Sequence, residues 1–190
     1  MKTLIINGSP RRDSKIRRML DEIAAELGAK GHEVKIVDLT RLAVSPCTGC
    51  MACRSTLNCV LPPDGAQSVL RMIEWCDALI IGSPCYWGNI PGQLKSLFDR
   101  MVYGMIKISS RDIPTPLHRG KKAAIVTTCT THWPWNILFH QSSGVVRALK
   151  GILKWSGFKV IASIQRGDTN RCPITDKDLR KARRLAHKFI

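Results

Sequence analysis

Apolar residues along the chain alternate between short continuous runs and longer stretches with helical spacing. Runs of this length are typical of strands buried on both faces of a sheet. The five runs cover residues 2–7, 33–39, 78–82, 122–127 and 158–164. We therefore expect five buried strands.

The stretches between the runs carry apolar residues three and four positions apart, which indicates helices packed on one face. The first begins after Ser14, a predicted N-cap, and stops at Gly28 or Gly31. Further helices are predicted over 65–75, 90–101, 145–155 and 177–189. Because parallel strands need crossovers that cover both faces, the pattern predicts one doubly wound α/β domain over residues 1–190.

Length and composition limit what the chain can be. Its 190 residues are 44% apolar and 23% charged, as in one globular domain, and no run reaches the roughly 18 apolar residues of a membrane span. The N-terminal apolar run is too short for a signal peptide, so we expect a cytoplasmic protein. The net charge of +16 favours acidic partners, nucleic acid or phosphorylated cofactors without choosing among them.

The loop after the first predicted strand, GSPRRDSK at 8–15, leads into a helix N-terminus. Free backbone N–H groups and the helix dipole favour an anion there, and Ser9, Arg11 and Lys15 add hydroxyl and charge. The loop matches neither the G-x-G-x-x-G pattern nor the G-K-[ST] ending of a nucleotide P-loop. A lone terminal phosphate, as on FMN, fits it better; a turn with a solvated basic face is the alternative.

Two more loops extend this pattern. SPCYWGNIPGQLKSLFDR follows the third predicted strand and TTCTTHWPWN follows the fourth. Together with GSPRR they closely resemble the flavodoxin-like NAD(P)H-dependent FMN reductase family, and with the cysteines described below, its iron–sulfur flavoprotein branch. The segment P-x-Y-W-G-x-x-P followed by L-K-x-x-x-D-R is the most specific part. The resemblance covers nearly the whole chain and implies a flavodoxin-like sheet in the order 2-1-3-4-5.

The resemblance also implies a cofactor site. Ser9, Arg11 and Ser14 would hold the FMN phosphate, helped by Lys15, because Ile16 stands where relatives often have Asn or Thr. The flavin ring would lie between two loops, which supply Pro84, Cys85, Tyr86, Trp87, Gly88 and Asn89 on one side and Thr128, Cys129, Thr130 and Thr131 on the other.

Other roles near these loops are assigned more sparingly. Two adjacent aromatics between prolines are more typical of a loop than of a core, which is the alternative for Tyr86 and Trp87. Lys95, Asp99 and Arg100 are expected to be helix and interface residues. No catalytic acid or base is assigned, since isolated loop histidines are more often surface residues.

Four of the eight cysteines lie in a long loop predicted over 44–64, with the spacing C-x2-C-x2-C-x5-C. They are Cys47, Cys50, Cys53 and Cys59. Four cysteine thiolates are the ligand set of a [4Fe–4S] cluster, although this spacing differs from the bacterial ferredoxin run. Zinc, free thiols and a redox disulfide are the alternatives. Because the loop follows the second strand, we expect it beside the flavin loops, as an electron relay.

These features predict an FMN-dependent oxidoreductase, an electron-transfer flavoprotein. NAD(P)H or a reduced carrier protein would reduce FMN, and electrons would pass to a small acceptor such as a quinone or to an acidic carrier protein. A cluster-free NAD(P)H:quinone or FMN reductase is the alternative, and a homodimer or homotetramer is expected by analogy. A basic nucleic-acid-binding module with a structural metal is a remote alternative, because the charges of KDLRKARRLAHKF surround the apolar stripe of a packed helix.

Overall fold

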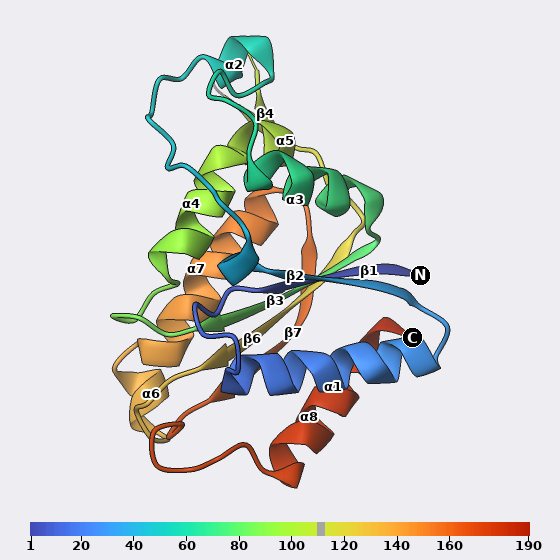
Figure 1. The fold of residues 1–190 in the computed structure, drawn as a ribbon, viewed down its shortest axis with the longest axis vertical. Helices are drawn as coiled ribbons and strands as arrows, with labels where there is room; N and C mark the ends of the chain where they lie inside the picture. Colours follow the sequence, from blue (N-terminus) through green and yellow to red (C-terminus); the bar gives the residue numbers. More distant parts are fainter. Residues whose placement is uncertain (110–112) are drawn as a thin grey trace.

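A five-stranded parallel sheet forms the centre of the computed structural model, which describes residues 1–109 and 113–190 (Figure 1). The sheet order is β2-β1-β3-β6-β7, so the predicted order 2-1-3-4-5 is confirmed. All four neighbouring pairs are parallel. The strands are β1 (Lys2–Asn7), β2 (Glu33–Asp38), β3 (Ala78–Pro84), β6 (Lys122–Thr128) and β7 (Lys159–Arg166).

Helices cover both faces of this sheet (Figure 1). One face carries α3 (Gly65–Trp75), α4 (Gly92–Arg100) and α7 (Gln141–Trp155). The other carries α1 (Lys15–Ala29) and α8 (Asp176–Ala186). Of the described helices, none is long and apolar enough to span a bilayer.

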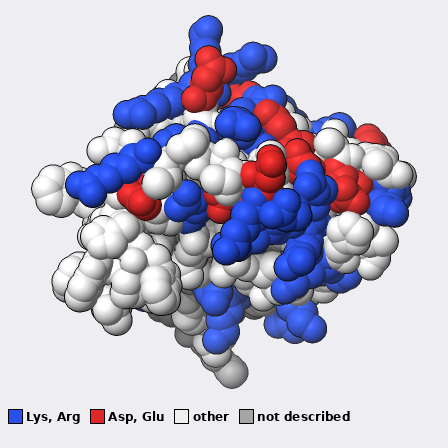
Figure 2. Space-filling model, turned by 90° about the horizontal axis from the view of Figure 1, so that it is seen from below, with Lys and Arg blue, Asp and Glu red and all other residues white. Residues whose placement is uncertain are grey.

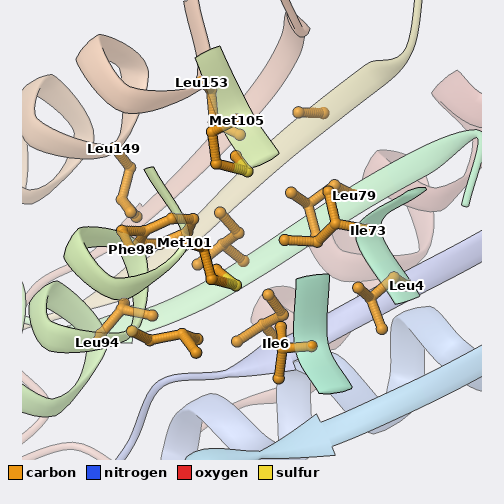
Figure 3. Close-up of a cluster of buried hydrophobic side chains, with 14 of the residues drawn as sticks. Leu4, Ile6, Ile73, Leu79, Leu94, Phe98, Met101, Met105, Leu149 and Leu153 are labelled. Atoms are coloured by element: carbon orange, nitrogen blue, oxygen red, sulfur yellow. The ribbon is translucent and has the colours of Figure 1, made fainter. Parts of the chain in front are cut away.

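The buried side chains divide into two cores, one on each face of the sheet. Along β1, Leu4 and Ile6 pack with α3 and α4, whereas Ile5 faces α1 and α8. Figure 3 shows the first of these cores, with Leu94 and Phe98 of α4 among the side chains over the strands. In β1, β3 and β6 alternate residues face opposite cores, so both kinds of position must be apolar, and this produces their continuous runs. The expectation of five buried strands is wrong for the edge strands β2 and β7, whose side chains are mostly half-buried or exposed.

Polar caps fix the helix starts. Ser14 caps α1, its side chain accepting a hydrogen bond from the backbone of Arg17 at 3.0 Å, as predicted. Asp64 forms a capping box with Gln67 at the start of α3. Each cap satisfies N–H groups that have no partner within the helix.

Several short elements were not predicted from the sequence. They are α2 (Cys53–Thr56), α5 (Val102–Met105), β4 (Ile106–Ile108), β5 (Pro114–Pro116), α6 (Trp135–Leu138) and the 3-10 turn Leu39–Arg41. The last turn of the helix predicted over 177–189 is a 3-10 turn, His187–Phe189. Elements of three or four residues are too short to show a period, and proline is disfavoured within strands. Helix α7 also begins earlier than predicted, at Gln141, because its first turn buries the polar Ser142 and the small Gly144.

Candidate functional site

A pocket of about 400 Å³ opens at the carboxyl edge of the sheet, where the loops after β1, β3, β6 and β7 meet. Ligands of open α/β sheets bind at this edge. The pocket is lined by Ser9, Arg11, Asp13, Ser14, Lys15, Ile16, Pro84, Cys85, Tyr86, Thr128, Cys129, Thr130, Thr169 and Asn170. Most of the predicted site residues are therefore brought together; Trp87, Gly88, Asn89 and Thr131 lie outside this lining.

The end of the pocket beside α1 is built from a tightly held loop. The buried Ser9 accepts a hydrogen bond through its hydroxyl from the backbone of Arg11 at 3.2 Å, and its own N–H donates to Asn7. A Cβ on Gly8 would lie 2.8 Å from the carbonyl oxygen of Gly82, so only glycine lets this loop lie against β3. The start of α1 lines the pocket through Ser14, Lys15 and Ile16, and the first N–H groups of a helix have no partner within it, which suits an anion.

The charged residues at this end differ from the prediction in detail. Lys15 lines the pocket, but its Nζ donates to the carbonyl oxygens of Thr169 and Cys172, so it also ties the loop after β7 to α1. Arg11 is exposed and makes no ion pair within the described residues. Asp13 adds a negative charge that sequence reasoning did not consider. Arg11 is thus the cation freest to meet an anionic ligand.

The loop after β3 forms a tight turn. Tyr86 and Asn89 exchange two backbone hydrogen bonds of 2.9 Å each. Between them, Trp87 and Gly88 have φ angles of 53° and 71°. A tryptophan rarely adopts a positive φ, and such strain is found most often at functional positions. The turn leaves Trp87 fully exposed at 102% while Pro84 and Tyr86 line the pocket.

The first turn of α7 supports this turn from behind. A Cβ on Gly144 would lie only 2.0 Å from the carbonyl oxygen of Gly88, so the helix and the turn are in direct backbone contact. Next to it, the Ser142 hydroxyl donates to Gln165 at 2.9 Å and accepts from the side-chain amide of Asn136 at 3.0 Å. These buried polar contacts fix the loop after β6 against β7.

Thr169 and Asn170 are pocket residues that the sequence analysis missed. The Thr169 hydroxyl donates to the carbonyl oxygen of Cys129 at 2.8 Å, which joins the loop after β7 to the loop after β6. The prediction considered only the loops after three strands. The signal was present, since Gly, Asp and Asn in the segment 167–170 mark a turn at the carboxyl end of a predicted strand.

Aromatic side chains crowd the segment that follows β6. Trp133, Trp135 and Phe139 are 76%, 42% and 64% exposed. The rings of Trp135 and Phe139 stack with their centroids 5.3 Å apart. Exposed apolar rings at this density are typical of a surface that contacts a ligand or another protein.

The loop cysteines surround a second, smaller cavity of about 70 Å³. Cys47, Cys50, Cys53 and Cys59 all line it and all are free thiols. Burial, followed by the charges of the other three, raises the pKa of Cys53, so the four thiols influence one another. Within the described ranges, however, no three His, Cys, Asp or Glu side chains are arranged to hold a metal ion. The thiols enclose a common hollow without forming a ready single-ion site.

Arg100, at the end of α4, clamps both ends of this loop. Its side chain is fully buried and donates to the carbonyl oxygens of Ser45 and Pro62 at 3.0 and 3.1 Å. It also forms an ion pair with Asp64 at 3.1 Å. The Nε atom has no partner among the described residues, although Arg100 lines the cysteine cavity. The expected interface role of Arg100 is therefore wrong: it is a buried cation beside the thiols, suited to an anionic occupant.

The cysteine loop and the pocket lie apart within the chain. Figure 1 shows the segment that carries α2 running away from the sheet edge, beyond α4. The cysteine cavity is lined by Asp99 and Arg100, at the end of α4, whereas the pocket lining includes no residue of this helix. The two cavities share no lining residue. The expectation that the cysteines lie beside the flavin loops is wrong for a single chain, because the loop continues past the sheet edge to reach Arg100.

The fold and the position of the pocket define a flavodoxin-like protein. The structure is similar to that of an NAD(P)H:quinone oxidoreductase from Methanothermobacter marburgensis, with a TM-score of 0.77 over 100% of this chain and 96% of that one, at 22% identity. It is also similar to oxidised flavodoxin 1 from Bacillus cereus, with a TM-score of 0.65 over 100% and 97% of the two chains, at 18% identity. These likenesses confirm the predicted fold.

Residues 1–166 match the family of NADPH-dependent FMN reductases, and the chain belongs to this family. A curated iron–sulfur flavoprotein from Archaeoglobus fulgidus is 38% identical over 105 residues, which are 55% of this chain and 47% of that protein. The chain spans about half the length of the first curated relatives it matches. The predicted membership of the flavodoxin-like FMN reductases is thus confirmed.

Proposed function

We propose that this chain binds FMN in the pocket at the sheet edge and acts as an NAD(P)H-dependent oxidoreductase. The observation that carries the proposal is the pocket itself, which combines an anion-binding helix N-terminus with walls formed by the loops after β3 and β6. Its volume of about 400 Å³ suits a small-molecule cofactor. Bound FMN supplies hydride and electron chemistry that amino-acid side chains lack.

The protein's part is to hold and orient the cofactor. The Ser9 hydroxyl, the first N–H groups of α1 and the Arg11 guanidinium would bind the phosphate. Pro84 and Tyr86 would contact one side of the ring, and the segment from Thr128 to Thr130 the other. No side chain is assigned as acid or base.

The surface supports two kinds of acceptor. A small planar acceptor such as a quinone suits the exposed aromatic side chains of the segment after β6. An acidic carrier protein suits the face in Figure 2, where lysine and arginine side chains gather in a patch beside a band of acidic ones. Along α8 and the turn after it, Lys181, Arg184 and Lys188 line a groove beside β7 without an ion-pair partner in the described part of the chain. Charge of this kind raises association rates at low salt.

We also propose a [4Fe–4S] cluster on Cys47, Cys50, Cys53 and Cys59. The donor set fits: four free thiols line one cavity, and the buried Arg100 offers an unpaired N–H to an anionic occupant. Thiolate clusters are commonly tuned by such donors. Because the cavity and the pocket lie apart in one chain, transfer between them favours a homo-oligomer that brings the loop of one copy to the pocket of another.

Anaerobic purification tests both parts of this proposal. We expect a coloured protein that releases about one FMN per chain, contains iron and acid-labile sulfide, and oxidises NAD(P)H in the presence of a quinone. Protein that stays colourless and binds no added FMN would contradict the flavin proposal. Bound FMN without iron, after anaerobic reconstitution with iron and sulfide, would contradict the cluster alone.

A cluster-free NAD(P)H:quinone or FMN reductase is the second candidate. It is favoured by the arrangement of the cysteines, since no three ligand side chains of the described residues are placed to hold an ion. Zinc is disfavoured by the same observation. A nucleic-acid-binding role has less support, because Ala182, Leu185 and Ala186 bury one side of α8 and leave its charges as a solvated face.

A further inference from the structure

We propose that Cys85 and Cys129 are a redox-active pair that forms a reversible disulfide in the wall of the pocket, with small disulfides as the oxidising substrates. This goes beyond the flavin function and does not require the loop cysteines. Neither residue lines the cysteine cavity, and both line the pocket.

The strand register places the two cysteines opposite each other. Pro84 of β3 is paired with Thr128 of β6. The next residues continue this ladder, since the Cys85 N–H donates to the carbonyl oxygen of Thr128 at 2.9 Å. Neighbouring strands lie about 4.8 Å apart, inside the range of about 4.4–6.8 Å between the Cα atoms of a disulfide. A bridge therefore needs rotation of side chains more than movement of backbone.

Both thiols lie on the same side of the sheet, under the first turn of α7. The Cys85 thiol donates to the side-chain oxygen of Gln141 at 3.7 Å. The Cys129 thiol donates to the carbonyl oxygen of Thr131 at 3.4 Å and lies close enough to Ser142 to interact with it. Burial raises the pKa of Cys129, and the neighbouring Cys85 raises it further. The register and the shared position beneath Gln141 and Ser142 therefore place the two side chains on one side of neighbouring strands.

The other cysteines outside the loop offer no such pair. Cys76 is buried, and its thiol donates to the carbonyl oxygen of Ile73. Cys172 donates to its own neighbour Asp168. Burial raises the pKa of Cys76 and no other cysteine is among the causes of that shift, and the acceptor of the Cys172 thiol is a carboxylate. They are therefore suitable controls for oxidation at a single thiol.

Exposure assigns a role to each member of the pair. Cys85 is half-buried and reachable from the pocket, so its thiolate attacks a small disulfide and expels one thiol, leaving a mixed disulfide. Cys129, only 5% exposed, loses its proton to solvent and attacks the Cys85 sulfur, expelling the second thiol. In total, two protein thiols become one disulfide while the small disulfide is reduced to two thiols.

Peptide mapping tests this directly. Protein purified with its FMN is treated with oxidised glutathione, its free thiols are alkylated, and it is digested with trypsin. Cys129 is the sole cysteine of peptide 123–147, and peptide 72–95 carries Cys85 and Cys76. We expect these two peptides to be linked, and the link to disappear on reduction. Absence of the linked peptide when the loop cysteines are oxidised in the same sample would overturn the proposal.

Matched variants separate the roles. Cys76→Ser and Cys172→Ser should keep the linked peptide, whereas Cys85→Ser and Cys129→Ser should lose it. Cys129→Ser should in addition retain glutathione on Cys85, because the attacking thiol stays but the resolving thiol is gone. A link that survives in Cys85→Ser, or is lost in Cys76→Ser, would contradict the assignment. The same mapping on flavin-free protein shows whether Cys85 and Cys129 form the disulfide when FMN is absent. Failure of the disulfide proposal can therefore be distinguished from failure of the chain to bind FMN.

Discussion

The pocket and the cysteine loop are built in opposite ways. The pocket lies where four parallel strands end, and its walls are fixed by the ladder and by close backbone contacts such as that between Gly144 and Gly88. The cysteine loop leaves the sheet altogether and is held by one buried side chain, Arg100. The geometry of a site at a sheet edge is determined by the strands themselves, whereas the geometry of a site on a long loop outside the sheet depends on a few specific contacts.

The sharpest test of this difference is Arg100→Met. The change leaves the partly buried Asp64 without its cation, and we expect a loss of about 3–5 kcal/mol in the free energy of unfolding. In protein that still folds, iron content should fall while FMN binding persists. Urea unfolding together with iron and FMN assays measures this.

Lys95→Met is the matched control on the same helix. Lys95 pairs with Asp99 at 2.5 Å, but both side chains are exposed, so its loss should cost less than about 1 kcal/mol. Equal stability of the two variants would show that Arg100 does not clamp the loop.

Gly144→Ala perturbs the pocket side of the comparison. The added methyl meets the carbonyl oxygen of Gly88, and we expect destabilisation of about 1–3 kcal/mol with weaker FMN binding and unchanged iron content. Gly151→Ala lies on the same helix with no atom within 4 Å of its Cβ, and it should stabilise by about 0.5–1 kcal/mol. Thermal unfolding and FMN titration compare the two variants. If Gly144→Ala changes neither the stability nor the FMN affinity, the close contact between Gly144 and Gly88 is contradicted.

A smaller effect is expected at the anion end of the pocket. Arg11→Ala should weaken FMN binding about tenfold, because one exposed charged hydrogen bond is lost, and the difference should shrink at high salt. Arg12→Ala removes the neighbouring cation, which does not line the pocket, and should leave the affinity nearly unchanged. FMN titrations at two salt concentrations decide between them.

The smallest expected effect is on how the free energy of unfolding depends on pH in acid, through Asp64. Burial would raise the pKa of Asp64, but hydrogen bonds from the backbone of Ser45 and Ala66, and then Arg100, lower it overall. Its carboxylate therefore stabilises the fold above its unfolded pKa of about 3.9, and this contribution is lost as the pH falls through the lower, folded value. Asp64→Asn should lack that part of the acid dependence, about 1 kcal/mol, in unfolding measured from pH 5 downward. Parallel acid curves for the two proteins would refute it.

The sequence predicted the three central strands, β1, β3 and β6, well because strands buried on both faces must be apolar at nearly every position. It also predicted most of the pocket, since Ser9, Pro84 and Thr128 all follow such strands. It could not predict the role of Arg100 in holding the loop. In the sequence Arg100 is indistinguishable from a cation on a helix surface, because its carbonyl partners Ser45 and Pro62 are distant along the chain. Nor could periodicity show that the turn around Trp87 would direct its side chain into solvent, because that depends on two backbone angles.

The Arg100 clamp has a consequence for how the cysteine segment can vary. It acts as a noncovalent cross-link that closes the segment from Ser45 to Asp64 into a ring. The entropy of closing a flexible ring rises only with the logarithm of its length, by about 0.6 kcal/mol for each doubling. Insertions between the cysteines are therefore thermodynamically cheap as long as both ends still reach the guanidinium, so this part of the chain can change its length without disturbing the sheet.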